Sequence, residues 1–189
     1  MLILMAVCVS CKKEPDPELP FMTFSIDLSW SVWVEFQLAG SEKAIIDWGD
    51  GSESKTHTLL SYHASDWDSG SPKYRFRHVY FSSDERPDSP YYTIKITGEN
   101  ITHLDCSHVE LMSLDVSKNA KLIYLRCGSN GLSIKMLNDL FKTLHSNNSD
   151  YKSINISNNP GTDACDRSIA TDKGWSVYSY SYTYIYLNQ

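Results

Sequence analysis

The sequence ITHLDCSHVELMSLDVSKNAKLIYLRCGSNGL, residues 101–132, repeats the pattern L-x-x-L-x-Φ-x-x-N, in which Φ is an apolar residue. Successive copies start ten and eleven residues apart, so equivalent positions recur every 21 residues, as Leu104 and Leu125 do. Cys106 and Cys127 have the same spacing. A fixed period of this length indicates a chain that coils and packs each copy on the next. We therefore expect Leu104 to lie beside Leu125 on adjoining parallel strands.

The period continues after an insertion. Residues 133–145 carry apolar side chains at helical spacing, which predicts an amphipathic helix. Residues 163–173 predict a second, shorter helix that ends at Gly174. Parallel strands are then expected at 104–106, 125–127, 154–156 and 175–177, with 114–116 on another side of the coil.

Two further features of this half follow from the repeat. Asn119, Asn130 and Asn158 are expected to turn the backbone and to bond buried carbonyl groups. The alternating tyrosines of residues 178–186 predict a strand that covers the last coil, because short solenoids need protected ends.

Upstream of the repeat, every even position from Phe24 to Leu38 is apolar. This alternation predicts half-buried strands, with a bend near residues 29–31 because the run is long for one strand. Further strands are expected at 44–48, 74–80 and 91–97, each separated by turn-rich sequence. Residues 21–98 therefore predict a compact antiparallel β-sandwich.

Both halves resemble known families. The turn IIDWGDGS at 45–52, followed by HVY at 78–80 and YTIKITG at 92–98, resembles PKD-type domains, which are immunoglobulin-like sandwiches. The enlarged segments 59–71 and 82–90 depart from that pattern. The ten/eleven repeats resemble the leucine-rich repeats of surface lipoproteins in the Bacteroidetes. The expected fold class is mainly β with an α/β solenoid, formed by a PKD-like β-sandwich at 21–98 and a leucine-rich-repeat domain at 99–189.

The amino terminus predicts a membrane anchor. Residues 1–9 are apolar but too short to span a bilayer, and they lead to Val9-Ser10-Cys11, which resembles the lipobox of bacterial lipoproteins. The resemblance implies a signal peptide at 1–10, lipidation of Cys11 and an outer-membrane, cell-surface location. No Lys or Arg precedes the apolar run, so either translation begins upstream or the free amino group supplies the charge. The alternative, a buried strand, fits poorly with the three prolines and five charges of 12–20, which predict a flexible tether over residues 11–20.

Composition argues against several functions. The net charge of −6 and the absence of any Lys/Arg run disfavour nucleic acid. The sequence contains no HExxH, GxSxG or phosphate-binding glycine loop, so we expect neither an enzyme nor a cofactor. No metal site is assigned. Calcium near Asp47 and Asp50, or near Asp66 and Asp68, stays open, although an EF-hand loop from Asp66 would place Arg77 where a carboxylate is needed.

The expected function is binding. Strand alternation places His103 and Asp105 outward on one strand, Tyr124 and Arg126 on the next, and Asn155 on a third. These side chains would share one sheet face, which is the usual recognition surface of leucine-rich repeats, and would meet a protein partner. The alternatives are a merely solvated face on a structural spacer, or an accessory glycan-binding lipoprotein of a polysaccharide uptake system whose tyrosines stack on sugar rings.

Overall fold

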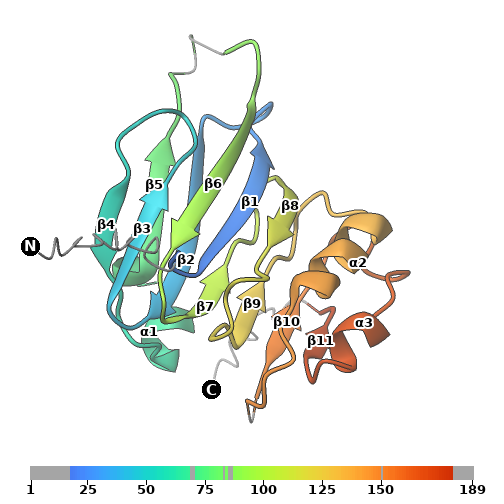
Figure 1. The fold of residues 1–189 in the computed structure, drawn as a ribbon. Helices are drawn as coiled ribbons and strands as arrows, with labels where there is room; N and C mark the ends of the chain where they lie inside the picture. Colours follow the sequence, from blue (N-terminus) through green and yellow to red (C-terminus); the bar gives the residue numbers. More distant parts are fainter. Residues whose placement is uncertain (1–17, 69–70, 83, 85–86, 150, 181–189) are drawn as a thin grey trace, which may run out of the picture.

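The computed structural model describes residues 18–68, 71–82, 84, 87–149 and 151–180. In this part of the chain two β-sheets pack face to face, and short helices flank them (Figure 1). The protein is therefore mainly β, as expected. Cys11 and residues 181–186 of the expected capping strand lie outside the described residues.

One sheet is antiparallel throughout and has five strands among the described residues. Their order is β4 (Lys55–Thr58), β3 (Lys43–Asp47), β6 (Tyr91–Thr97), β1 (Phe21–Asp27) and β8 (Leu111–Asp115). The strands expected near 44–48 and 91–97 are β3 and β6. The alternating run from Phe24 is divided by the predicted bend, because β1 ends at Asp27 and β2 begins at Trp33.

The other sheet is mixed and has six strands in the described residues. Their order is β11 (Ser176–Tyr178), β10 (Ser153–Asn155), β9 (Tyr124–Arg126), β7 (Ile101–Asp105), β2 (Trp33–Gly40) and β5 (Arg75–Val79). Strands β5, β2 and β7 pair antiparallel, whereas β7, β9, β10 and β11 pair in parallel.

The parallel register follows the repeat for the first three strands. Leu104 pairs with Leu125, and Leu125 pairs with Ile154, as predicted. The last strand is shifted, because Ile154 pairs with Val177 and not with Trp175. Trp175 is buried before the strand begins, and its indole N–H donates a hydrogen bond to the carbonyl of His145 at 2.9 Å. The prediction of a strand at 175–177 was therefore wrong by two residues in register. The leucine-rich-repeat solenoid itself stays a prediction.

The second predicted helix is shorter than expected. Helix α3 covers only Ser168–Thr171, and turns precede it. Gly174 does end this segment: it has a φ of +80° and its N–H bonds the carbonyl of Thr171 at 2.9 Å. Only glycine adopts such a backbone without steric cost, which explains the residue at this position.

One hydrophobic core runs through both halves of the chain. Phe24 of β1 and Phe36 of β2 meet edge to face across the sheets, with ring centroids 5.4 Å apart. The same cluster continues to the buried Leu125 and Phe141. Both sheets also cross the boundary predicted at residues 98 and 99, since β7 pairs with β2 and β8 pairs with β1. The residues before and after this boundary therefore share both sheets and one core.

Two buried asparagines connect successive coils. The side-chain oxygen of Asn130 accepts from the N–H groups of Val109 and Leu111, both at 3.0 Å, and its amide donates to the carbonyl of Cys106 at 2.9 Å. Asn159 repeats this arrangement one coil later. Asn158 turns the backbone as expected, with a φ of 57°, but it is exposed, and Asn159 bonds the buried carbonyls of Cys127 and Ile156 instead. The asparagine that bonds the neighbouring main chain is the third residue after a buried apolar position. Asn130 follows Cys127 in this way, and Asn159 follows Ile156.

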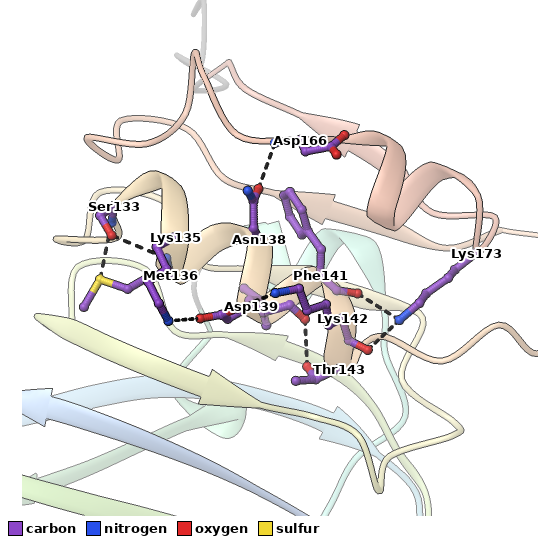
Figure 2. Close-up of polar contacts among 11 residues, drawn as sticks. Ser133, Lys135, Met136, Asn138, Asp139, Phe141, Lys142, Thr143, Asp166 and Lys173 are labelled. Atoms are coloured by element: carbon purple, nitrogen blue, oxygen red, sulfur yellow. Dashed lines mark hydrogen bonds and ion pairs between the residues drawn. The ribbon is translucent and has the colours of Figure 1, made fainter.

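Helix α2 (Ile134–Thr143) lies beside β8, with α3 below it (Figure 1). Ser133 caps its first turn, and the helix buries Leu137, Leu140 and Phe141 against the core. Figure 2 shows the polar contacts that hold the helix to the following segment. Lys173 donates to the carbonyls of Phe141 and Lys142 at 3.0 and 2.5 Å, which places a cation at the helix carboxyl end.

The remaining helical turns, α1 (Ala64–Asp68) and the 3₁₀ turn η1 (Pro72–Tyr74), belong to the segment between β4 and β5. Within the described ranges, none of the helices is both long and apolar enough to cross a membrane.

Candidate functional site

The predicted binding residues do lie together on the outer side of the six-stranded sheet. His103 pairs with Tyr124, and Asp105 pairs with Arg126 on the neighbouring strand. Arg126 pairs in turn with Asn155 on β10. Because directly paired residues point to the same side of a sheet, these five side chains share one face.

The same face extends over the sandwich, which the sequence analysis did not foresee. Gln37 of β2 pairs with Asp105 on one side and with Arg75 of β5 on the other. A transverse row of polar side chains therefore crosses all six strands, ending at Tyr178 beside Asn155. The alternation in β2 predicted that Gln37 points outward, but only the β2–β7 pairing reveals which residues lie beside it.

We use "sheet face" for the outward side chains of this sheet together with the tyrosine that lies over it. They include Trp33, Glu35, Gln37, Arg75, Arg77, Val79, His103, Asp105, Tyr124, Arg126, Asn155, Tyr178 and Tyr62.

An ion pair occupies the centre of the sheet face. Arg126 Nη1 lies 3.2 Å from Asp105 Oδ2, and Asp105 Oδ1 accepts a hydrogen bond from the N–H of Ser107 at 3.0 Å. The Asp105 side chain is 11% exposed and that of Arg126 is 34% exposed. The carboxylate therefore holds the guanidinium in place, while part of the guanidinium remains open to solvent. Such a preorganised arginine loses little conformational entropy when it meets a partner.

His103 does not face water, contrary to the prediction. Its ring stacks on Tyr62 with centroids 4.1 Å apart and planes 4° apart, and the centroid of the Tyr124 ring lies 5.3 Å from that of His103. Burial lowers the pKa of His103 to about 4, so its imidazole is neutral at pH 7. The cause is the enlarged segment after β4, which carries Tyr62 across the sheet. Tyr62, which is 38% exposed, takes the outermost position that was predicted for His103.

Asn155 is also covered, which corrects its assignment as a water-facing residue. Its side chain is buried, its amide donates to the carbonyl of Tyr180 at 3.1 Å, and its oxygen accepts from Ser157 N–H at 3.0 Å. These bonds hold the chain that follows β11 against the turn after β10. Asn155 therefore supports the fold at this edge of the sheet face.

Aromatic and cationic side chains form the solvent-exposed part of the sheet face on the sandwich. Trp33 is 42% exposed, and the guanidinium of Arg77 lies 4.4 Å from its ring centroid. Arg75 lies 3.6 Å from the carboxylate of Glu35, and Val79 is 56% exposed at the strand end. Tryptophan, tyrosine and arginine are the residues most enriched among the energetically dominant contacts of protein interfaces.

In the two acidic turns where the sequence left a calcium site possible, Asp47, Asp50 and Asp66 make other contacts. Asp50 Oδ2 lies 2.7 Å from His78 Nε2, and Asp47 accepts from the N–H of Gly49. Although partial burial opposes ionisation, hydrogen bonds from Ser52 and His78 lower the pKa of Asp50 to about 2. Asp66 forms an ion pair with Lys73. Among the residues that the structure describes, no group of three or more His, Cys, Asp or Glu side chains is arranged to hold a metal ion.

The histidine and the thiols noted in the sequence are packed. His78 is partly buried, and its ring stacks on Trp48 with centroids 4.8 Å apart. Cys106 and Cys127, which are 21 residues apart in the repeat, are free and completely buried. Burial raises the pKa of each thiol, which keeps it protonated and unreactive.

Comparison of the chain with protein-family models, with curated proteins and with solved structures gave no significant match. No relative therefore assigns a role to any residue of the sheet face.

Proposed function

We propose that this chain is a lipid-anchored protein of the cell surface that binds a protein partner through the sheet face. In this proposal Cys11 carries the lipid, residues 11–20 form a tether, and a PKD-like sandwich joins a leucine-rich-repeat domain. The 21-residue register of β7 and β9 and the asparagine ladder support the repeat assignment. The positive φ of Gly49 and Gly51 supports the PKD-like turn.

The observation that carries the binding proposal is the solvent-accessible Arg126, held by Asp105 and lying near the aromatic layer of Tyr62 and Tyr124. Six strands spaced about 4.8 Å apart make the sheet about 24 Å wide. A standard protein interface buries about 800 Å² on each partner, which corresponds to a patch roughly 28 Å across. The sheet face has this scale because β2 and β5 extend the parallel strands.

The binding test uses the full-length chain on an array of extracellular-matrix proteins and glycans. We expect binding to a protein, and we expect the double substitution Tyr62→Ser and Arg126→Ser to weaken it by about 100-fold, since each removes a central anchor. Lys135→Ser is the matched control, because Lys135 lies on α2 and not on the six-stranded sheet. Undiminished affinity of the double variant would remove the sheet face as the site.

The same array separates the other functions. Tyr151 is 58% exposed and its hydroxyl lies 3.3 Å from that of Tyr178, which favours sugar stacking as the second candidate. An accessory glycan-binding lipoprotein would bind glycans alone and lose that binding on substitution of Tyr151. A structural spacer would bind nothing on the array.

The anchor is tested separately. Cys11→Ala removes the thiol that the lipobox resemblance assigns to lipidation, so we expect the protein to move from the membrane fraction to the soluble fraction. Incorporation of a labelled fatty acid should be lost in parallel. Cys165→Ala, which changes a half-buried thiol in the folded part, should leave both readouts unchanged. A Cys11→Ala variant that still fractionates with membranes would refute the anchor.

A further inference from the structure

A separate groove opens where the two sheets end. Strands β4 and β5 are the last strands of the five-stranded and six-stranded sheets, and they lie at the same side of the sandwich (Figure 1). The groove between them has a volume of about 430 Å³. This volume falls in the range of about 300–1,000 Å³ that is usual for small-molecule sites. Its floor is formed by inward-facing side chains, whereas Arg75 and Arg77 at its rim also belong to the sheet face.

The groove is positively charged. Four of its lining residues are Lys55, Lys73, Arg75 and Arg77, and its described lining contains no carboxylate. Asp66 neutralises Lys73, and Glu35 lies 3.6 Å from Arg75. In the described part of the chain, neither Lys55 nor Arg77 forms an ion pair with a carboxylate. One cation without an ion pair in the described residues therefore stands on each wall. These are Lys55 on β4 and Arg77 on β5, whose guanidinium lies over the ring of Trp33.

The floor of the groove is made of rings. His57 and Phe76 meet edge to face with centroids 5.0 Å apart, and His78 stacks on Trp48 beside them. His57 pairs with the buried Ala44, so it points between the sheets. Burial and the nearby Lys55 lower the pKa of His57, which leaves its ring neutral at pH 7. A ligand in the groove would meet the rings of Trp48 and Phe76 and two imidazoles below, with Asp50 bonded to that of His78, and ammonium or guanidinium groups at the rim.

We propose that the β4–β5 groove binds an anionic sugar unit, a uronate or a sulfated hexose within a glycan chain. The side chains of Lys55 and Arg77, which form no ion pair with a described carboxylate, complement the acidic group, and the aromatic floor complements the C–H face of a sugar ring. The groove is open, so the chain can continue beyond the bound unit. The net charge of −6 disfavours long, densely charged polyanions, which experience the repulsion of the whole molecule.

Charged edge strands also have a general role, because they prevent association of sheet edges between molecules. That role alone predicts that substituting Lys55 changes the tendency to aggregate and leaves sugar affinity untouched. The two explanations therefore give different experimental results.

Calorimetric titration of the full-length chain tests the proposal with four probes. These are a galacturonate trisaccharide, a sulfated galactose disaccharide, the neutral galactose trisaccharide and an acidic peptide. We expect one or both of the acidic sugars to bind, and the neutral sugar to bind at least about tenfold more weakly. Comparison of the first two probes identifies the acidic group as carboxylate or sulfate. Affinity should fall as salt rises, because the paired charges are near the surface.

The variants Lys55→Gln and Arg77→Gln should each weaken acidic-sugar binding by about tenfold while thermal unfolding stays unchanged. Lys118→Gln, an exposed lysine outside the groove, is the matched control. Equal binding of the neutral sugar, no sugar binding at all, or preference for the acidic peptide would overturn the proposal. The Tyr62→Ser and Arg126→Ser variant should retain sugar binding, so that failure of either site is recognised independently.

Discussion

At the scale of single residues, Asn130 contributes most to joining one coil to the next. Its side chain contacts main-chain groups of Cys106, Val109 and Leu111 in the preceding coil and of Cys127 and Gly128 in its own. All of these groups are inaccessible to water, and an unpaired buried N–H or C=O costs about 1–3 kcal/mol. No apolar side chain can replace both the donor and the acceptor of an amide.

We therefore expect Asn130→Ala to lower the free energy of unfolding by about 3 kcal/mol or more. Urea denaturation followed by circular dichroism measures this change. Asn148→Ala is the control, because Asn148 is exposed, and it should change stability by less than about 0.5 kcal/mol. A small effect of Asn130→Ala would mean that water replaces the amide.

A second regularity at this scale is backbone conformation. His108, Ser129 and Asn158 all have positive φ, at 59°, 53° and 57°, although none is glycine. Each is the second residue after an inward position, Cys106, Cys127 or Ile156. The turns that follow β7, β9 and β10 therefore each contain a left-handed residue, and the sequence alone does not reveal it, because the three side chains have nothing in common.

At the scale of elements, what the sequence predicted depended on local periodicity. The alternation from Phe24 to Leu38 predicted β1 and β2, and helical spacing predicted α2. Both predictions were possible because, within one strand or helix, buried and exposed side chains recur at a fixed interval over a short stretch of sequence. The register of β7, β9 and β10 also followed, since a repeat states which residues are equivalent.

The candidate site was less predictable, because solvent exposure depends on segments distant in sequence. His103, Tyr124, Asp105, Arg126 and Asn155 were correctly placed on one face. The solvent exposure of two of them was predicted wrongly, because Tyr62 covers His103 and the chain at Tyr180 covers Asn155. No periodicity specifies where an irregular loop crosses a sheet. The side chains that β2 and β5 add to the sheet face were also missed, because the pairing of β2 with β7 joins segments that are distant in sequence.

At the scale of the whole molecule, the two halves share sheets as well as a core. β7 pairs antiparallel with β2 on one side and in parallel with β9 on the other, so it joins the antiparallel strands of the sheet to its parallel strands. Separating the halves would expose Leu104, Phe24 and Leu114, all of which are buried. This loss of buried apolar surface links their stabilities.

We therefore expect the chain to unfold in one cooperative transition. Hydrogen–deuterium exchange under mild denaturant should give the same opening free energy for the central amides of β6, before residue 98, and of β9, after it. Coincident urea transitions by fluorescence and circular dichroism would support this result. A β9 that opens at markedly lower denaturant than β6 would contradict it and would indicate separate folding units.

The position of β1 has a mechanical consequence. This strand follows residues 11–20, which we propose to be a tether, and it lies between β6 and β8 with hydrogen-bonded neighbours on both sides. Tension that enters upstream of Phe21 pulls along the strand, perpendicular to its interstrand bonds, and loads them together. Rupture then requires many bonds to break at once, whereas an edge strand pulled from its end would peel open bond by bond. If the molecule is held at its amino terminus and binds a ligand elsewhere, flow would load the hydrogen bonds of β1 in shear, and the strand would resist being pulled out.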